Sequence, residues 1–170
     1  MLLTEGYRQE QEALHAKGNY GTASLKYGEV VSELVEMSGA ATMLDYGCGS
    51  MRNLAKVLNC EVMYQGYDPG VKEYANEPDA ADFVACIDVL EHIEPECLDA
   101  VIDHLASKCK HLAFVTIHTG PAAKVLSDGR NAHLIQETEA WWLPKLLAKF
   151  RLLKFQARNG GFEVLLKRLY

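Results

Sequence analysis

Apolar residues recur along the chain with a helical spacing in four segments. Over residues 24–38 they repeat every three or four positions, and Gly39 follows where a helix commonly ends. A short helix is predicted after a glycine-rich turn, and another begins at Pro95, a residue type that suits the first helical position. A fourth helix is predicted over 139–150, where Pro144 indicates a kink or a delayed start.

Short apolar runs alternate with these helices. They cover residues 42–46, 61–67, 82–88 and 111–118. Helices that alternate with buried strands are typical of βαβ units on a parallel sheet. Near the end of the sequence, Asn159 and Gly160 are a strong hairpin-turn signal between two further strands, 152–158 and 161–169. We therefore predict an α/β, Rossmann-like fold, with a mostly parallel sheet, helices on both faces and a C-terminal antiparallel hairpin.

Composition narrows the class of protein. The 170 residues are 49% hydrophobic, which suits one domain over 1–170. A net charge of −6 disfavours a nucleic-acid partner. No apolar run is long enough to cross a bilayer and the start does not resemble a secretory signal, so we expect a cytoplasmic protein without a membrane partner. Five cysteines without a C-x-x-C pair indicate reduced thiols.

The glycine-rich turn after the first predicted strand is the main candidate for a ligand site. It reads Asp45-Tyr46-Gly47-Cys48-Gly49. Glycines allow a sharp turn and a close approach of a ligand, and the following helix can present N–H groups to an anion. A dinucleotide site needs a third glycine where this chain has Arg52. The Asp45 carboxylate would also repel a pyrophosphate and attract an ammonium or sulfonium ligand, which disfavours a nicotinamide-dependent oxidoreductase.

A second carboxylate ends the next predicted strand. Asp68 follows Asp45 by 23 residues. That separation is close to the one at which an acidic residue binds the two hydroxyls of a ribose. An aspartate before a proline can also be an ordinary turn residue. Because Asp68 occurs together with the glycine-rich turn, we favour the ribose role.

These motifs, with Cys86-Ile87-Asp88-Val89-Leu90-Glu91-His92-Ile93, resemble class I S-adenosylmethionine-dependent methyltransferases. The chain is similar above all to the group with a V-L-E-H stretch after the fourth strand, and the resemblance covers roughly residues 20–155. It implies S-adenosylmethionine as the cofactor. It also implies a set of cofactor-binding positions: Gly47, Cys48 and Gly49 around the cofactor, Asp45 at its methionine end, Asp68 at the ribose, and Ile87 and Asp88 nearby.

Two features depart from the family pattern. Met51 replaces the usual third glycine, and only 13 residues separate Asp68 from Asp82. This gap is too short for a helix plus a strand, so the edge strand after the second strand is predicted to be missing and no adenine-binding acid is named. Residues 41–170 are then the cofactor-binding core. Residues 1–40 are expected to form a helical lid, with Tyr20 facing the sulfonium or adenine or, alternatively, packed in the core.

The acceptor is expected beside the long irregular segment that follows His118. Ligands of open α/β sheets gather at the carboxyl ends of the strands, and loops of this length are usually functional. His133 is the first candidate for a general base or acceptor-positioning group, although such a histidine can also simply bond a carbonyl. His118 is the second catalytic candidate, with a structural role at the strand end as its alternative.

Three polar residues complete the predicted site. Asp88 would contact the cofactor or the acceptor, and Asn131 the acceptor. Arg130 would suit a carboxylate or phosphate on the acceptor, or form a salt bridge at a helix end. The histidine spacings match no zinc pattern, so no metal site is predicted.

The function predicted from these features is methyl transfer to an oxygen or nitrogen nucleophile by in-line displacement. The small size of the chain favours a small-molecule or otherwise compact acceptor. The alternative is a non-catalytic protein that binds S-adenosylmethionine or a partner protein on a trimmed methyltransferase fold. The sequence leaves the oligomeric state open, a homo-oligomer included.

Overall fold

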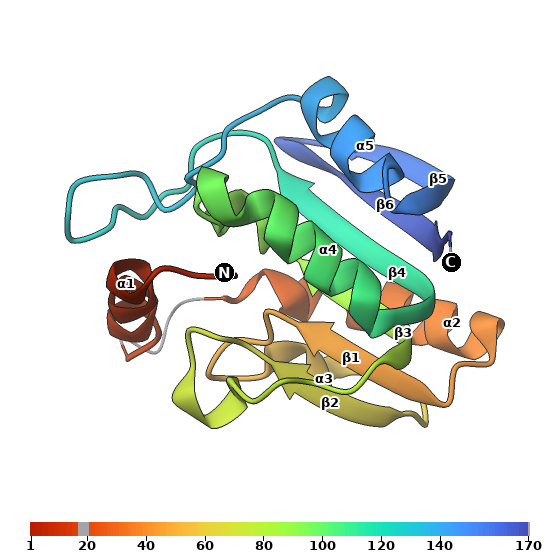
Figure 1. Ribbon diagram of the computed structural model, residues 1–170. Helices are drawn as coiled ribbons and strands as arrows, with labels where there is room; N and C mark the ends of the chain where they lie inside the picture. Colours follow the sequence, from red (N-terminus) through yellow and green to blue (C-terminus); the bar gives the residue numbers. More distant parts are fainter. Residues whose placement is uncertain (17–20, 170) are drawn as a thin grey trace.

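The computed structural model describes residues 1–16 and 21–169 (Figure 1). The α-helices are α1 (Glu5–Ala16), α2 (Gly28–Ser38), α3 (Asn53–Val57), α4 (Leu98–Lys108) and α5 (Glu139–Leu147). The strands are β1 (Thr42–Tyr46), β2 (Met63–Tyr67), β3 (Ala81–Ile87), β4 (Cys109–His118), β5 (Phe150–Arg158) and β6 (Gly161–Arg168). Four short 3-10 helices are η1 (Ala23–Lys26), η2 (Lys72–Tyr74), η3 (Leu90–His92) and η4 (Pro95–Cys97).

The six strands form one sheet in the order β2-β1-β3-β4-β6-β5. Strands β1 to β4 pair in parallel, while β6 pairs antiparallel with both β4 and β5. Gly160, with φ +79°, lies in the turn between β5 and β6, where a left-handed conformation suits glycine. The mostly parallel sheet and its antiparallel C-terminal hairpin are therefore confirmed.

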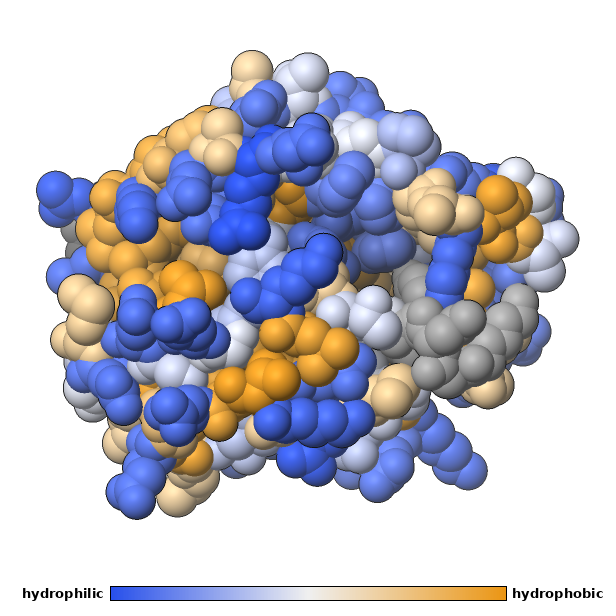
Figure 2. Space-filling model, turned by 180° about the vertical axis from the view of Figure 1, so that it is seen from behind, coloured by the Kyte–Doolittle hydropathy of each residue, from blue (hydrophilic) through white to orange (hydrophobic). Residues whose placement is uncertain are grey.

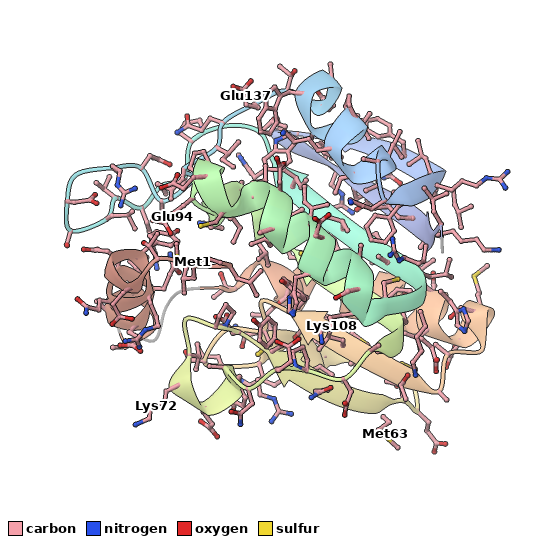
Figure 3. All side chains as sticks on the ribbon, viewed as in Figure 1. Met1, Met63, Lys72, Glu94, Lys108 and Glu137 are labelled. Atoms are coloured by element: carbon pink, nitrogen blue, oxygen red, sulfur yellow. The ribbon has the colours of Figure 1, made fainter. Side chains whose placement is uncertain are left out.

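Strand β2 is one edge of the sheet. The segment that follows it holds only turns and η2 before the chain enters β3, which pairs with β1. Within the described part of the chain no strand lies outside β2, so the predicted loss of this edge strand is confirmed. Met63 at the start of β2 and Lys72 beyond its end both point away from the body of the protein (Figure 3).

Each face of the sheet is covered by two helices. Neighbouring strand residues face opposite sides, so Leu44 and Val84 pack with α4 and α5, while Met43 and Phe83 pack with α2 and α3. All four side chains are 0% exposed. Figure 1 shows α4 and α5 in front of the sheet and α2 and α3 behind it. Helices on both faces, as predicted, leave the ends of the strands as the open side of the sheet.

Two helical details differ from the sequence prediction. Helix α5 starts at Glu139 and continues through Pro144, so its start is not delayed. Helix α1 lies within the helical segment expected over 1–40, but the sequence pattern does not set its bounds because most of its residues are polar. Its buried Tyr7 and Leu14 pack with residues of the segment after β4 in a third, small apolar cluster. This cluster connects the beginning of the chain to the predicted acceptor region.

The back of the molecule carries both hydrophilic and apolar side chains (Figure 2). Apolar side chains gather at the upper left of that view, at the end of the sheet formed by β5 and β6. In β5, Leu153 and Phe155 are among the large apolar side chains that are exposed. Among the described residues, no helix has both the length and the apolar character needed to span a bilayer.

Candidate active site

A cavity of about 380 Å³ opens at the carboxyl ends of β1 to β4. Its walls come from the glycine turn after β1, the ends of β2, β3 and β4, helix α1, and the segment between β4 and α5. Ligands of open α/β sheets bind at this position, and pockets for small molecules commonly start at roughly 300 Å³. The cavity is therefore the candidate site.

The glycine turn forms one wall of the cavity. Gly47 has φ +83° and Gly49 has φ +63°, a region that side chains disfavour. A Cβ atom on Gly47 would also lie 2.4 Å from the Cγ2 atom of Val89. The Gly47 N–H donates to the carbonyl of Tyr67 at 2.7 Å, which fixes the turn against the end of β2. Both glycines are thus required by backbone geometry.

Asp68 is held at the cavity wall by two backbone groups. The Gly49 N–H donates to its Oδ2 and the Gly70 N–H to its Oδ1, both at 2.9 Å. The side chain is buried, yet it lines the cavity together with both glycines. The glycine turn and the carboxylate at the end of β2 therefore form one rigid unit.

Asp45 is a buried carboxyl group that lines the cavity on the same side as the glycine turn. The Tyr64 hydroxyl donates to its Oδ2 at 2.7 Å. Burial raises the pKa of Asp45 to about 7, and the charge of Asp68 adds to this, while the Tyr64 hydrogen bond and Arg52 act in the opposite direction. A cationic ligand beside Asp45 would stabilise its ionised form.

The charges around the cavity favour a cation. Three aspartates line it, Asp45, Asp68 and Asp88, against a single described lysine, Lys124. Asp88 has φ +51°, unusual for a residue with a side chain, and its Oδ1 accepts the Thr116 hydroxyl at 2.6 Å. Neighbouring Ile87 also lines the cavity, so both residues predicted at the end of this strand lie at the site.

One predicted cofactor residue, Cys48, does not line this cavity with its side chain. Cys48 is buried, and its Sγ would be 2.9 Å from a Cβ atom placed on Gly66, so its thiol packs against β2. Its N–H donates to the Tyr67 carbonyl at 3.1 Å, so Cys48 shapes the turn through its backbone. Tyr20 lies outside the described residues.

The two predicted catalytic histidines lie together on the opposite wall. The ring centroids of His118 and His133 are 5.0 Å apart, and both residues line the cavity. His133 Nδ1 is 2.6 Å from the carbonyl oxygen of Gly120, a contact that requires a proton on Nδ1 and leaves the Nε2 lone pair as an acceptor. Burial lowers the pKa of His133, which favours this neutral form.

The structure places the predicted acceptor residues Arg130 and Asn131 away from the cavity walls. Arg130 is exposed and binds Asp128, with 2.7 Å between its Nε and an Asp128 carboxylate oxygen. Asn131 Oδ1 accepts the N–H groups of Ala122 and His133, each at 2.9 Å. The side chains of both residues form hydrogen bonds within this segment, and these bonds hold the segment in its folded shape. Arg130 thus forms a salt bridge within the loop, not at a helix end.

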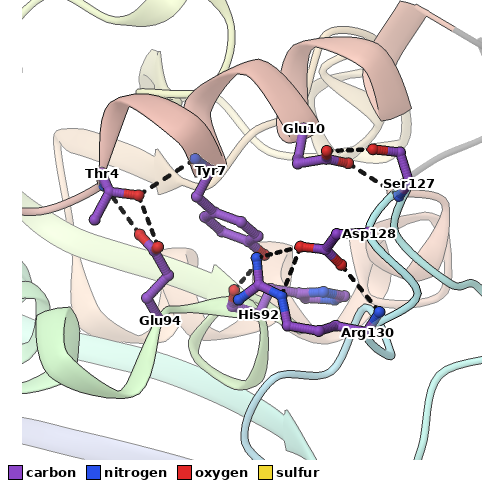
Figure 4. A network of polar contacts seen from close by, with 8 residues as sticks. All are labelled: Thr4, Tyr7, Glu10, His92, Glu94, Ser127, Asp128 and Arg130. Atoms are coloured by element: carbon purple, nitrogen blue, oxygen red, sulfur yellow. Dashed lines mark hydrogen bonds and ion pairs between the residues drawn. The ribbon is translucent and has the colours of Figure 1, made fainter.

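Helix α1 lines another side of the cavity, and polar contacts join it to η3, η4 and the segment after β4 (Figure 4). The Tyr7 hydroxyl donates to the carbonyl of His92, and Glu94 accepts the hydroxyl of Thr4 at 2.7 Å. Farther along the helix, Glu10 accepts the N–H of Ser127 at 3.0 Å. Tyr7 and Gln11 line the cavity, and neither is among the predicted site residues, because α1 has no continuous apolar stripe.

Three side chains beside the cavity form a cluster that the sequence did not predict. Glu91, His92 and His133 each place one nitrogen or oxygen atom within 4.8 Å of the others. Burial raises the pKa of Glu91 well above its ordinary value, and the charge of Asp88 adds to the shift. The expectation of no metal site rested on sequence spacing, and spacing cannot detect a cluster that joins η3 to a distant loop.

The amino-acid sequence of the chain matches the model of a known protein family. The family is described as a methyltransferase domain, and the match covers residues 21–164. The chain belongs to the methyltransferase domain family. This membership confirms the resemblance to class I S-adenosylmethionine-dependent methyltransferases. Among curated proteins, none matches the sequence.

Solved structures of methyltransferases share the fold. An O-methyltransferase family protein from Burkholderia thailandensis is 20% identical with a TM-score of 0.64, over 85% of this chain and 56% of that protein. A 1,6-didemethyltoxoflavin-N1-methyltransferase from the same organism, with S-adenosylhomocysteine bound, is 16% identical with a TM-score of 0.68, over 95% of this chain and 86% of that one. A magnesium protoporphyrin IX methyltransferase from Synechocystis is 19% identical with a TM-score of 0.56, over 84% and 81%. This chain thus spans little more than half of the first of these proteins.

Proposed function

We propose that this protein transfers the methyl group of S-adenosylmethionine to an oxygen or nitrogen atom of a small or otherwise compact acceptor. The observation that carries the proposal is the cavity itself. On one side of the cavity a glycine turn lies beside Asp45 and Asp68. On the opposite side lie His118 and His133. Cofactor-side and acceptor-side groups therefore face one enclosed space.

In this proposal the cofactor lies along the wall formed by β1 and β2. Asp68 binds the ribose hydroxyls, and Gly47 and Gly49 let the backbone approach the cofactor closely. Asp45 serves the cationic methionine end. The excess of aspartates over lysine in the cavity wall stabilises the positive charge of the cofactor.

The acceptor lies on the histidine side, where in-line attack on the methyl carbon forms the new bond. The carbon–sulfur bond breaks, its electron pair remains on sulfur, and S-adenosylhomocysteine is released. His133 Nε2 accepts the hydrogen of the attacking group, since Nδ1 is already bonded to Gly120. Two of the similar structures are a 1,6-didemethyltoxoflavin-N1-methyltransferase and a magnesium protoporphyrin IX methyltransferase, which supports a small-molecule acceptor.

The first 40 residues act as a lid in this proposal. Helix α1 lines the cavity and is attached to both η3 and the segment after β4, through Tyr7 and Glu10. A lid in this position excludes water from the reacting atoms and limits the size of the acceptor. Acceptor choice therefore depends on α1 and the 119–138 segment.

The proposal is tested by cofactor binding and by product formation. Isothermal titration calorimetry of the full chain should detect S-adenosylmethionine, and an acceptor panel should yield S-adenosylhomocysteine. No cofactor binding would overturn the proposal. Binding without product from any acceptor would instead support the alternative of a non-catalytic S-adenosylmethionine or partner-binding protein.

We expect cofactor affinity to depend on pH through Asp45. With its pKa at about 7, the carboxyl is largely neutral in the free protein at pH 5. The dissociation constant should therefore fall about tenfold per pH unit up to pH 7 and then level off, while the cofactor amine stays protonated below about pH 8. Calorimetry across this range measures the effect.

Two variants isolate the contribution of Asp45 to this pH dependence. Asp45→Asn keeps an acceptor for the Tyr64 hydroxyl but should bind the cofactor weakly, with little change between pH 5 and 7. Tyr64→Phe removes a hydrogen bond that lowers the pKa of Asp45, so the curve should move to higher pH. Because the raised pKa stabilises the fold only at lower pH, Asp45→Asn should also melt above the wild type at pH 8. A wild-type curve that is flat from pH 5 to 7 would contradict this role of Asp45.

A further inference from the structure

Gln11 is a buried polar side chain of α1 with a hydrogen-bond donor that the fold leaves unused. The residue is 8% exposed and lines the cavity. Among the described residues, nothing accepts a hydrogen bond from its Nε2 atom. A buried amide N–H without an acceptor is costly, and proteins rarely keep one that no ligand or water completes. The donor is therefore available to a molecule bound in the cavity.

The side chain of Gln11 crosses Gly70, next to the carboxylate of Asp68. A Cβ atom placed on Gly70 would lie 2.9 Å from the Cβ and 3.6 Å from the Cγ of Gln11, and 3.3 Å from Asp68 Oδ1. The Gly70 N–H donates to the same Oδ1 at 2.9 Å. The amide group of Gln11 follows directly after its Cγ, so it is within reach of a ligand held at the Asp68 carboxylate. The unused donor thus lies on the cofactor side of the cavity.

We propose that Gln11 Nε2 donates a hydrogen bond to a ribose hydroxyl oxygen of S-adenosylmethionine, so that α1 is part of the cofactor site. The inference rests on the proposed function, in which Asp68 binds the ribose. A hydroxyl group has one hydrogen to donate and two lone pairs that accept. A carboxylate only accepts, so it takes the hydrogens of the hydroxyls and leaves their lone pairs without a donor. The amide of Gln11 supplies that donor beside the carboxylate.

The same hydrogen bond connects the two sides of the cavity through α1. The helix is already held to the acceptor side, because the Tyr7 hydroxyl donates to the carbonyl of His92 and Glu10 accepts the N–H of Ser127 at 3.0 Å (Figure 4). Gln11 lies one helical turn beyond Tyr7 on the same face, and both line the cavity. A bound cofactor adds a contact at Gln11, so α1 is held on both sides only when the cofactor is present.

S-adenosylhomocysteine and its 2′-deoxy and 3′-deoxy analogues test the hydrogen bond by calorimetry on the full chain. Gln11→Met keeps the length of the side chain and removes the donor, so it should weaken S-adenosylhomocysteine binding about tenfold. For the analogue that lacks the hydroxyl bound by Gln11, variant and wild type should agree within about twofold, while the other analogue should again show the loss. Gln9→Met, at an exposed position of the same helix, should leave all three affinities unchanged.

The melting temperature separates a binding role from a structural one. Without ligand, Gln11→Met removes an unpaired buried donor and should melt at or above the wild type. With saturating S-adenosylhomocysteine, the melting temperature of the wild type should rise by more than that of the variant, because the wild type binds more tightly. Hydrogen exchange at the backbone amides of α1 should also slow on binding, and more in the wild type than in Gln11→Met.

The outcomes distinguish this inference from the proposed function. If Gln11→Met and the wild type bind S-adenosylhomocysteine equally well, the role of Gln11 is overturned and the proposed function stands. An equal loss for both deoxy analogues would also overturn it, because the donor would then serve another part of the cofactor. A variant that melts well below the wild type without ligand would assign Gln11 to the fold instead. A wild type that binds neither S-adenosylmethionine nor S-adenosylhomocysteine would overturn the proposed function itself.

Discussion

Asp68→Ala is expected to weaken S-adenosylmethionine binding by about 100-fold or more, as measured by calorimetry at pH 7.5. The carboxylate is proposed to bind the ribose hydroxyls, and it also orders the site before the cofactor arrives. Its two oxygens hold the N–H groups of Gly49 and Gly70. Charge-assisted hydrogen bonds contribute roughly 1.5–3 kcal/mol each, and a 100-fold loss corresponds to about 2.7 kcal/mol.

Two further variants show whether the loss is specific. Asp68→Asn keeps one carbonyl oxygen and lacks the charge, so we expect an affinity between those of the wild type and Asp68→Ala. Asp128→Ala removes an exposed carboxylate that binds only within its own loop and should leave cofactor affinity unchanged. Equal affinity of Asp68→Ala and the wild type would contradict the ribose assignment, provided that the wild type binds the cofactor.

Local patterns in the sequence were sufficient for most of the fold. Met43 and Leu44 face opposite sides of the sheet and are both buried, and the same holds for Phe83 and Val84. A strand covered on both faces in this way appears in the sequence as a continuous apolar run. The missing edge strand followed from counting, because a short segment cannot hold both a helix and a strand. Asp45 and Asp68 were identifiable from their positions, because Asp45 lies near the end of β1 and Asp68 directly follows β2.

The acceptor side was predicted less well because its contacts join distant parts of the chain. Arg130 and Asn131 are polar residues in a long loop, yet the hydrogen bonds of their side chains are made within that same loop. Glu91 and His133 come together only when η3 and the loop pack at the end of the sheet. Helix α1 has few apolar positions, and its burial arises from Tyr7 meeting a carbonyl far along the sequence. Periodicity reports which face of an element is buried, not which loop will cover it.

His133→Ala is expected to lower kcat for methyl transfer by about 100-fold to 10,000-fold, the usual contribution of a positioned acid–base group. The dissociation constant for S-adenosylmethionine should remain within about threefold of the wild type, because His133 lies on the wall opposite Asp68. The loss is expected because the Nε2 lone pair is available to accept the hydrogen of the attacking group, while Nδ1 is bonded to Gly120.

His118→Ala is the matched comparison for this variant, because His118 lines the same wall beside His133. His118 Nδ1 lies 3.3 Å from the Gly120 carbonyl oxygen and 3.2 Å from the Gly120 nitrogen, and both distances are longer than the 2.6 Å contact of His133. A ring held less firmly positions a nucleophile less well, so His118→Ala should lower kcat by a smaller factor than His133→Ala. Single-turnover assays with the acceptor found by the panel measure both variants. A larger loss in His118→Ala would assign the proton-accepting role to His118 instead.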